Sequence, residues 1–367
     1  MSAALASRKA APVQPPQRPI RLMIVDDSMV ARAVLSRMVE VGGGIEIAAV
    51  AGTAEDAVEA LAHVVVDVIL LDLEMPGAGG LKKLPEILKV ARGARVLIVS
   101  SLAEEGAAET VTALAQGAAD TLLKPGTGRL QGRFADILMS KIRALGQRND
   151  ELQPAMPALS AFRAPLCAMA TDSLSLLAIG ASTGGIHALG RFFANLPQQV
   201  GAPILVTQHL PVPFMDVFAR QLATAAKRPA RIVADGELLC DDVIHIAPGD
   251  RHLTVEQRRN GLFVRLTEGR VSSGCLPSVD PMLSSIAALR RAGSVAVILS
   301  GMGRDGLEGA ELLVRAGGSV LVQDEESSAV WGMPKAVADA GLAAAILPPE
   351  KLARRVASRI GQTHAHQ

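Results

Sequence analysis

Three carboxylates follow apolar runs in the first third of the chain. Asp26 and Asp27 come after the run 20–25, and Asp72 comes after the run 66–71. If both runs are strands of one parallel sheet, their carboxyl ends meet at one edge and the three carboxylates converge there. Gathered negative charges repel each other, and a hard divalent cation such as Mg²⁺ relieves that repulsion. We therefore predict a Mg²⁺ site at Asp26, Asp27 and Asp72, with Asp72 accepting a phosphoryl group.

A hydroxyl and an ammonium group are expected at the same edge. Ser100 ends the apolar run 95–100, and Lys124 follows the run 119–123. Both groups could hold phosphoryl oxygens. A single acidic residue at a strand end more commonly caps the next helix or faces water. Five matching positions together favour a phosphorylation site.

In the second half, a hydroxyl, an imidazole and a carboxylate each follow a different apolar run. Ser182 lies in a glycine-rich turn that opens a helix, His209 closely follows Ile204–Val206, and Asp305 follows Val295–Leu299. At one sheet edge, His209 could remove the proton of Ser182 while Asp305 orients the imidazole. The order Ser, His, Asp is unfamiliar, but roles and geometry define such a triad.

Each of these positions has a simpler interpretation. Glycines around Ser182 equally suit a nucleotide phosphate site, and a histidine at a strand end is commonly only hydrogen-bonded. An early Asp complements the helix dipole for about 0.3 to 1 kcal/mol. A nucleotide site needs no base, so the convergence favours a hydrolase. The alternative is a phosphorylation-dependent adaptor without enzymatic activity, which binds a nucleotide or a protein through Gly184 and Gly185.

These positions need two α/β sheets to bring them together. Residues 1–19 are rich in Ala, Pro and Gln and are expected to be a flexible tail, and 146–172, with several prolines, a linker. In both 20–145 and 173–362, nearly continuous apolar runs alternate with helical patterns, which predicts two doubly wound parallel sheets. The runs 243–247, 253–256 and 262–266, with a turn at Asn260-Gly261, predict a small antiparallel part in the second domain.

Composition excludes several classes of protein. Lys and Arg total 37 against 36 Asp and Glu, and aromatics are 2%, so nucleic acid is not an expected partner. The three cysteines are widely spaced and form no C-x-x-C pair, which favours a reducing cytoplasm. No apolar run is long enough to span a bilayer, so we expect no direct membrane insertion.

The first domain resembles response-regulator receiver domains, which are flavodoxin-like. The resemblance lies in VDDS at 25–28, LDLEMP at 71–76, VSS at 99–101 and KP at 124, and it covers residues 20–145. Two positions depart from the pattern: Gly79 stands where receivers usually carry Asp, and Thr121 where an aromatic residue is common. These departures leave the phosphorylation chemistry intact and affect how the signal is passed on.

The second domain resembles the Rossmann-like catalytic domain of CheB-type methylesterases. The shared motifs are GASTGG at 180–185, QHLP at 208–211 and SGMGRDG at 300–306. Further similar stretches are Ala247-Pro248-Gly249, Pro277-Ser278-Val279-Asp280, Gln323-Asp324-Glu325 and Gly332-Met333-Pro334, so the resemblance covers most of 174–360. It implies Ser182 as nucleophile, His209 as general base and Asp305 as its orienting partner. It also implies the Met302 N–H as an oxyanion donor and Thr183 as a support for the histidine.

These resemblances imply a complete activity. The chain is expected to hydrolyse glutamate γ-methyl esters on the cytoplasmic helices of chemoreceptors, and to deamidate glutamine there, in chemotactic adaptation. A chemotaxis histidine kinase would be the phosphodonor, Mg²⁺ would serve the phosphorylation of Asp72, and the esterase reaction would need no cofactor. We expect the unphosphorylated receiver to cover the esterase cleft and phosphorylation to favour an open arrangement.

Overall fold

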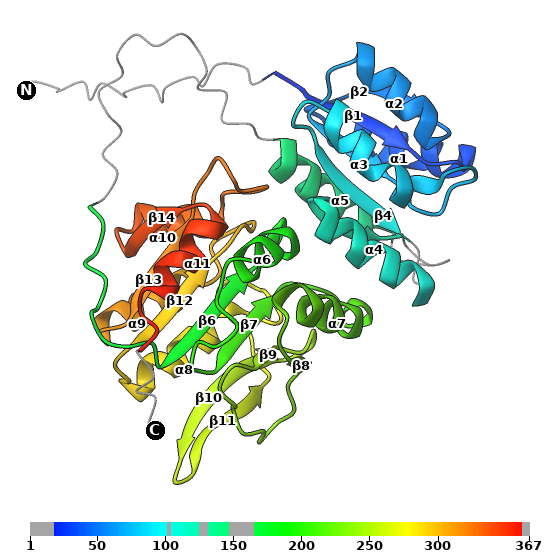
Figure 1. Ribbon diagram of the computed structural model, residues 1–367. Coiled ribbons are helices and arrows are strands. Elements are labelled where there is room, and N and C mark those ends of the chain that lie inside the picture. Colours follow the sequence, from blue (N-terminus) through cyan, green and yellow to red (C-terminus); the bar gives the residue numbers. More distant parts are fainter. Residues whose placement is uncertain (1–17, 101–103, 125–130, 147–164, 362–367) are drawn as a thin grey trace, which may run out of the picture.

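The computed structural model describes residues 18–100, 104–124, 131–146 and 165–361 (Figure 1). The expected flexible tail, 1–19, lies almost entirely outside these residues. Most of the expected linker, 146–172, does as well. The described residues form two α/β domains joined through one contact surface.

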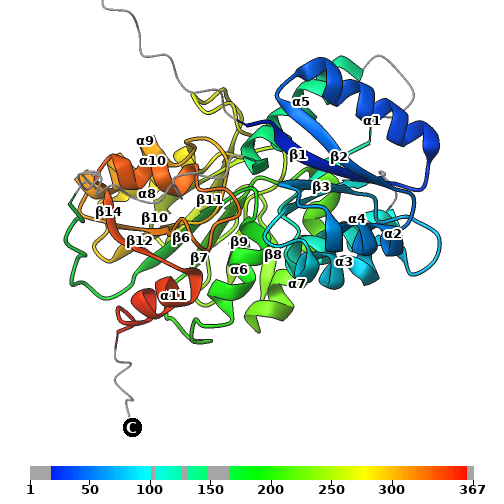
Figure 2. The same ribbon diagram turned by 90° about the horizontal axis from the view of Figure 1, so that it is seen from above.

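The first domain is a five-stranded parallel sheet with helices on both faces (Figure 2). The strand order β2-β1-β3-β4-β5 is flavodoxin-like and confirms the prediction. Helices α1 and α5 lie on one face and α2, α3 and α4 on the other. The strands are β1 (Ile20–Val25), β2 (Ile45–Ala51), β3 (Val68–Leu71), β4 (Arg95–Ser100) and β5 (Asp120–Leu123). The helices are α1 (Met29–Gly42), α2 (Ala54–His63), α3 (Gly79–Val90), α4 (Glu104–Gln116) and α5 (Gln131–Gly146).

Side-chain caps fix where the first helices begin. The Ser28 hydroxyl accepts a hydrogen bond from the N–H of Ala31 at the start of α1, and Thr53 does the same for Asp56 at the start of α2. Each cap satisfies a backbone donor that has no partner inside the helix. The turn between Val25 and α1 is thereby defined, and it is this turn that carries Asp26 and Asp27.

The second domain contains a seven-stranded parallel sheet in the order β14-β13-β12-β6-β7-β9-β8. Its strands are β6 (Leu176–Ala181), β7 (Ile204–Gln208), β8 (Ala230–Ile232), β9 (Ile244–Ile246), β12 (Ser294–Ile298), β13 (Ser319–Gln323) and β14 (Ala343–Leu347). Its helices are α6 (Gly185–Phe193), the 3₁₀ helix η1 (Val212–Phe214), α7 (Met215–Ala226), α8 (Val279–Leu289), α9 (Leu307–Arg315), α10 (Met333–Asp339) and α11 (Pro349–Ala357). Strands β12, β6 and β7 are neighbours at its centre, so the loops that follow them share one edge.

The predicted antiparallel part is confirmed for one hairpin and wrong for one strand. β10 (His252–Arg258) and β11 (Gly261–Thr267) pair antiparallel, as expected from the Asn260-Gly261 turn. The run 243–247 instead contains β9, which pairs parallel with β7 and β8 inside the large sheet. All three residues of β9 are fully buried, which is typical of an interior parallel strand.

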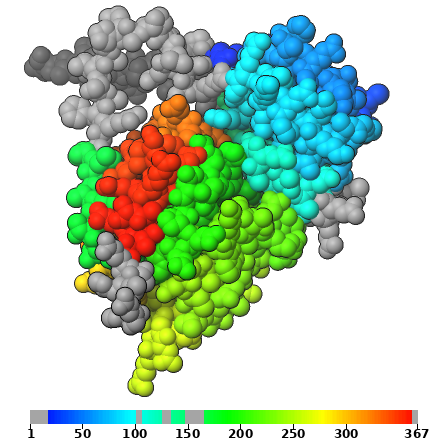
Figure 3. Space-filling view, in the orientation of Figure 1, coloured from blue at the N-terminus to red at the C-terminus, as the bar shows by residue number. Residues whose placement is uncertain are grey.

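The two domains meet where α4 of the first packs against α6, η1 and α7 of the second (Figures 1 and 3). Hydrogen bonds also join the two domains. The Gln221 amide donates to the Thr112 hydroxyl at 2.8 Å, His187 Nδ1 lies 3.0 Å from the Ala115 carbonyl, and Arg95 donates to the Ser328 carbonyl at 3.0 Å. Apolar side chains such as Leu114, Ala118, Ile186 and Leu210 line the same surface, so the contact is partly hydrophobic.

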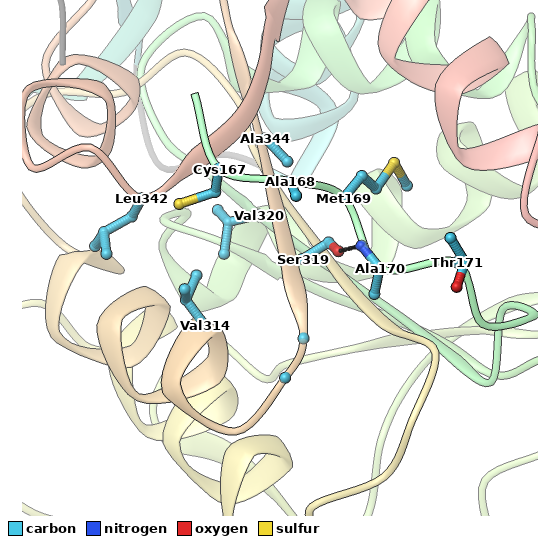
Figure 4. A pocket seen from close by; sticks show the side chains of 12 residues that line it. Cys167, Ala168, Met169, Ala170, Thr171, Val314, Ser319, Val320, Leu342 and Ala344 are labelled. Carbon is cyan, nitrogen blue, oxygen red and sulfur yellow. Dashed lines mark hydrogen bonds between the residues drawn. The ribbon is translucent and has the colours of Figure 1, made fainter. Parts of the chain in front are cut away.

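Residues 165–172 pack on the second domain, although we expected them to be linker. The N–H of Cys167 donates to the Ala343 carbonyl at the start of β14, and the N–H of Ala170 donates to the Ser319 hydroxyl at the start of β13. A cavity of about 340 Å³ lies between this segment, α9 and β13 (Figure 4).

Within the described ranges, the structure has no helix both long and apolar enough for a membrane span.

Candidate active site

Ser182 lies in a tight turn between β6 and α6. Its N–H donates to the Ser300 carbonyl at 3.0 Å, and its own carbonyl accepts from Gln208 Nε2 at 2.9 Å and from the Gly185 N–H at 2.8 Å. Gly184 has a φ of +77°, a conformation that favours glycine, so the chain turns sharply into α6. These contacts fix the backbone of Ser182 and leave its side chain half-buried at the sheet edge.

His209 and Asp305 form a hydrogen-bonded pair beside this turn. His209 Nε2 lies 2.8 Å from Asp305 Oδ2. Asp305 is only 1% exposed, and it also accepts from the Ser278 hydroxyl at 2.5 Å and from the Val279 N–H at 2.7 Å. A carboxylate with this many donors is held in one orientation, and it holds the imidazole in turn.

The electrostatics of the pair favour charge on both members. Burial raises the pKa of Asp305, but the hydrogen bonds from His209, Ser278 and Val279 outweigh it and hold that pKa well below its ordinary value. Burial lowers the pKa of His209, but its contacts with Asp305 and Cys275 outweigh burial and raise the pKa to about 9. The raised pKa of His209 favours the protonated imidazole near neutral pH, and the free base becomes more abundant as the pH rises.

Ser182 and His209 are brought together by the neighbouring strands β6 and β7. The His209 N–H donates to the Ala181 carbonyl at 3.0 Å, and Gln208 Nε2 donates both to the Ser182 carbonyl and to the His209 carbonyl. Ser182 and His209 line the same small cavity. The three loops that the sequence singled out therefore meet at one edge, and this arrangement could support proton transfer between a hydroxyl and an imidazole.

The loop after β12 adjoins the Ser182 side chain. A Cβ atom built on Gly301 would lie 2.8 Å from the Cβ of Ser182. The loop is fixed by the Gly301 N–H, which donates to the Val330 carbonyl, and by the Met333 N–H, which donates to the Gly301 carbonyl. Met302 is the next residue in this loop, and its part as an oxyanion donor stays a prediction.

Thr183 has a partner that the sequence did not reveal. Its hydroxyl donates to the Oδ2 atom of Asp120 in the first domain, and the neighbouring Gly184 N–H donates to the Ala119 carbonyl at 2.6 Å. Lys141 forms an ion pair with the same Asp120 carboxylate. The expected support of His209 by Thr183 stays a prediction. Asp120 and Ala119 line the small cavity with Ser182, so the first domain contacts the serine turn.

The acidic residues of the first domain converge at its carboxyl edge. Carboxylate oxygens of Asp26, Asp27 and Asp72 lie within 4.8 Å of one another, a donor set that suits Mg²⁺. Lys124 Nζ contacts Asp72 at 2.5 Å and Asp26 at 3.0 Å. Burial raises the pKa of Asp72 above its ordinary value, with Lys124 opposing that shift. The buried Ser100 hydroxyl has no hydrogen-bond partner among the described residues, so it is available to donate a hydrogen bond to a phosphoryl oxygen.

The structure shows the surroundings of Gly79 and Thr121, the two residues that depart from the receiver pattern. Gly79 opens α3 with a φ of +73°, a conformation that residues other than glycine rarely adopt. Thr121 is buried in β5, and its hydroxyl has no partner within the part of the chain that the structure describes. A small side chain therefore fills the position where receivers commonly place an aromatic ring.

Two residues at the site were missed by sequence reasoning. Asp120 begins β5, at the edge opposite to Lys124, and no local pattern links it to the serine turn. Cys275 entered the sequence analysis only as part of a cysteine count, yet its Sγ lies within 4.8 Å of ligand atoms of His209 and Asp305. Only the three-dimensional arrangement could show either contact.

Comparisons with known proteins agree with both domains. A family model described as response regulator receiver domain matches residues 22–133, and one described as CheB methylesterase matches residues 177–356. The protein-glutamate methylesterase/protein-glutamine glutaminase 2 of Caulobacter vibrioides is 41% identical over 343 residues, which cover 93% of this chain and 99% of the relative. The corresponding protein of Azospirillum brasilense is 40% identical over 370 residues, which cover 93% of this chain and 93% of the relative. The solved CheB methylesterase catalytic domain of Thermotoga maritima is 35% identical, with a TM-score of 0.49, over 50% of this chain and 98% of that chain.

Proposed function

The chain belongs to the receiver-containing family of protein-glutamate methylesterases/protein-glutamine glutaminases, and on this premise we propose how its residues perform and control that reaction. It is a chemotaxis methylesterase/glutaminase regulated by its receiver domain. The adaptor without enzymatic activity, the alternative left open above, does not fit this family.

Ser182 is the proposed nucleophile and His209 the proposed general base. His209 takes the hydroxyl proton while Ser182 Oγ bonds to the ester carbonyl carbon, and the imidazolium then protonates the departing methoxide to give methanol. Water attacks the resulting acyl-enzyme, giving its proton to His209, and the freed Ser182 oxygen takes that proton back. With a glutamine substrate, ammonia leaves in place of methanol. Asp305 orients the imidazole throughout.

Two donors are proposed to stabilise the oxyanion. The Met302 N–H follows the Gly301 backbone that adjoins Ser182, and the amino end of α6 begins three residues after Ser182. N–H groups at a helix amino end favour negative charge, and such donors act strongly where water is excluded. The turn therefore provides both the nucleophile and part of the electrostatic stabilisation.

The receiver is proposed to take its phosphoryl group on Asp72 from a chemotaxis histidine kinase. Asp26, Asp27 and Asp72 would hold Mg²⁺, which when bound neutralises charge on the phosphoryl group. The Lys124 ammonium and the unpartnered Ser100 hydroxyl would hold the phosphoryl oxygens. The proposed substrates are methylated cytoplasmic helices of chemoreceptors, which implies a cytoplasmic location.

Regulation is proposed to act through the contact between the receiver and the serine turn. The contact residues Ala119 and Asp120 cover the Ser182 turn, so a receptor helix must displace them before it reaches the hydroxyl. The phosphoryl site lies at the other end of β5, beyond a strand of four residues that spans roughly 13 Å. Phosphorylation of Asp72 would favour an arrangement in which β5 and α4 release the turn.

The observation that carries the proposed chemistry is the 2.8 Å hydrogen bond between His209 and Asp305 beside the Ser182 turn. The test is methanol release from methylated receptors by Ser182→Ala, with Ser140→Ala on the exposed face of α5 as the matched control. We expect Ser182→Ala to lose release while Asp72 is still phosphorylated, and Ser140→Ala to keep both. Normal methanol release by Ser182→Ala would refute the proposed nucleophile.

A further inference from the structure

A thiol joins the histidine and carboxylate of the proposed catalytic site. Cys275 lies in the loop between β11 and α8 and is half-buried, and its Sγ, a His209 ring nitrogen and an Asp305 oxygen all lie within 4.8 Å of one another. The three residues come from three separate loops. The hydrolysis mechanism proposed above uses the imidazole and the carboxylate but assigns no role to the thiol.

We propose that His209, Cys275 and Asp305 form a binding site for a divalent transition-metal ion of the zinc type, and that the bound ion inhibits ester hydrolysis. The ligand class is argued from the donor atoms. An imidazole nitrogen, a thiolate sulfur and a carboxylate oxygen together suit Zn²⁺ or Co²⁺, whereas Mg²⁺ and Ca²⁺ prefer oxygen ligands alone. Three protein ligands leave a fourth tetrahedral position for water.

The geometry needs only small movements. At zinc bond lengths of about 2.0 to 2.3 Å, tetrahedral ligand atoms lie roughly 3.3 to 3.8 Å apart. The three donor atoms here lie within 4.8 Å of one another, so none has to move by more than about 1.5 Å. The His209 Nε2 and Asp305 Oδ2 atoms, 2.8 Å apart, would separate slightly to admit the ion.

Neighbouring groups already orient the ligands. The Ser273 hydroxyl donates to Asp305 Oδ1 at 3.0 Å and accepts from the Cys275 N–H at 3.4 Å, so it connects two of the three proposed ligands. Ser278 and Val279 donate to the same carboxylate. Hydrogen bonds of this kind around a metal site fix ligand orientation and strengthen binding.

Inhibition follows from the use of the same imidazole, and this part of the inference rests on the proposed function. An ion on Nε2 takes the lone pair of that nitrogen, so the neutral ring carries its proton on Nδ1 and has no lone pair left for the Ser182 proton. An ion on Nδ1 occupies the accepting lone pair directly. In either case His209 no longer acts as a base toward Ser182. Metal binding itself is independent of the esterase proposal and can be measured without a substrate.

The first test is Co²⁺ titration of the full chain, followed by the thiolate-to-cobalt charge-transfer absorption. The wild-type protein is expected to develop this band, Cys275→Ser to lose it and bind Co²⁺ at least about tenfold more weakly, and Cys167→Ser to keep it. Cys167 is a matched control because its thiol donates to the Gly341 carbonyl, away from the triad. A band that persists in Cys275→Ser, or no band in the wild-type protein, would overturn the site.

The second test begins with the wild-type protein, so its first part does not depend on the folding of a variant. Alkylation of wild-type protein by iodoacetamide is measured for each cysteine with and without Zn²⁺, and the exposed Cys240 serves as the internal reference. Zn²⁺ is expected to protect Cys275 and leave Cys240 reactive, and equal protection of both would contradict the site. In parallel, Zn²⁺ is expected to suppress methanol release by the wild type more than by Cys275→Ser. If the protein binds Co²⁺ at Cys275 but Zn²⁺ suppresses methanol release equally in both proteins, the metal site stands and inhibition through it is refuted.

Discussion

The Thr183 hydroxyl donates a hydrogen bond to the Asp120 carboxylate, and this contact joins the receiver to the residue that follows the proposed nucleophile. Asp120 is also paired with Lys141 of α5, so the carboxylate is held from both domains. The adjoining backbone bond from Gly184 to Ala119 lies alongside it. The receiver therefore contacts the serine turn through specific hydrogen bonds as well as through apolar side chains.

Removal of the Asp120 carboxylate should weaken the closed arrangement. A hydrogen bond to a charged group contributes about 1.5 kcal/mol or more, and about 1.4 kcal/mol is a tenfold change in an equilibrium. Asp120→Ala is therefore expected to raise methanol release by the unphosphorylated protein about tenfold. Asp136→Ala, a substitution of an exposed carboxylate on α5, is the control and should change nothing. Release by Asp120→Ala at or below the wild-type rate would contradict this regulatory contact.

The esterase rate should rise with pH into the alkaline range. His209 has a pKa of about 9 and must be neutral to take the Ser182 proton, so kcat/KM should increase about tenfold per pH unit below that pKa. Asp305→Asn removes the hydrogen-bonded negative charge that raises this pKa. The Asp305→Asn variant should show the rise of kcat/KM at lower pH than the wild type, and its maximal rate should be lower. A pH–rate profile that is flat between neutrality and pH 9 would argue against His209 as the base.

A methyl group added at Gly301 should disturb the nucleophile. A Cβ there would lie 2.8 Å from the Ser182 Cβ and would also collide with the Met333 sulfur. Relief of this clash must displace Ser182 or the loop, and a misplaced nucleophile reacts more slowly, so Gly301→Ala should lower kcat about tenfold or more. Gly190→Ala is the matched control, because a Cβ at that helical position meets no atom within 4 Å. Equal activity of the two variants would show that the loop after β12 does not constrain Ser182.

Removal of divalent cations should block phosphorylation of the first domain and leave the unstimulated esterase activity of the second domain unchanged. Without a divalent cation, the gathered charges of Asp26, Asp27 and Asp72 oppose the arrival of a phosphoryl group. EDTA is therefore expected to abolish phosphoryl incorporation from a small acyl phosphate and to abolish the accompanying stimulation, without lowering unstimulated methanol release. Asp72→Asn provides the baseline for incorporation. Stimulation that survives in EDTA would argue against a metal-dependent receiver.

Both sheets and the carboxyl-edge placement of the key residues could be predicted from the sequence, because the signal is local. Ser182 and Asp72 each follow an apolar run, and parallel strands bring such positions to one edge. His245 shows where local reasoning failed: it interrupts the short run of β9, which we assigned to the antiparallel part, yet it is fully buried in the large parallel sheet. Burial on both faces depends on neighbouring strands, which the local pattern does not identify.

Contacts between distant segments could not be predicted at all. Asp120 and Thr183 belong to different domains, and their meeting depends on how α4 packs against α6. Cys275 lies near His209 although it belongs to the loop between β11 and α8, and the sequence around it carries no spacing typical of a metal site. Sequence patterns therefore predicted which reactive residues gather at the carboxyl edge of each sheet. Contacts between the domains and between distant loops depend on tertiary packing and could not be predicted.

Covalent labelling examines whether Ser182 is an activated nucleophile. The full chain would be treated with a fluorophosphonate and the modified residue mapped by peptide mass spectrometry, with His209→Gln as the comparison. We predict one adduct, on Ser182, which forms much more slowly in His209→Gln because the hydroxyl then lacks its base. An unlabelled Ser182, or labelling that proceeds equally fast without His209, would contradict the proposed mechanism.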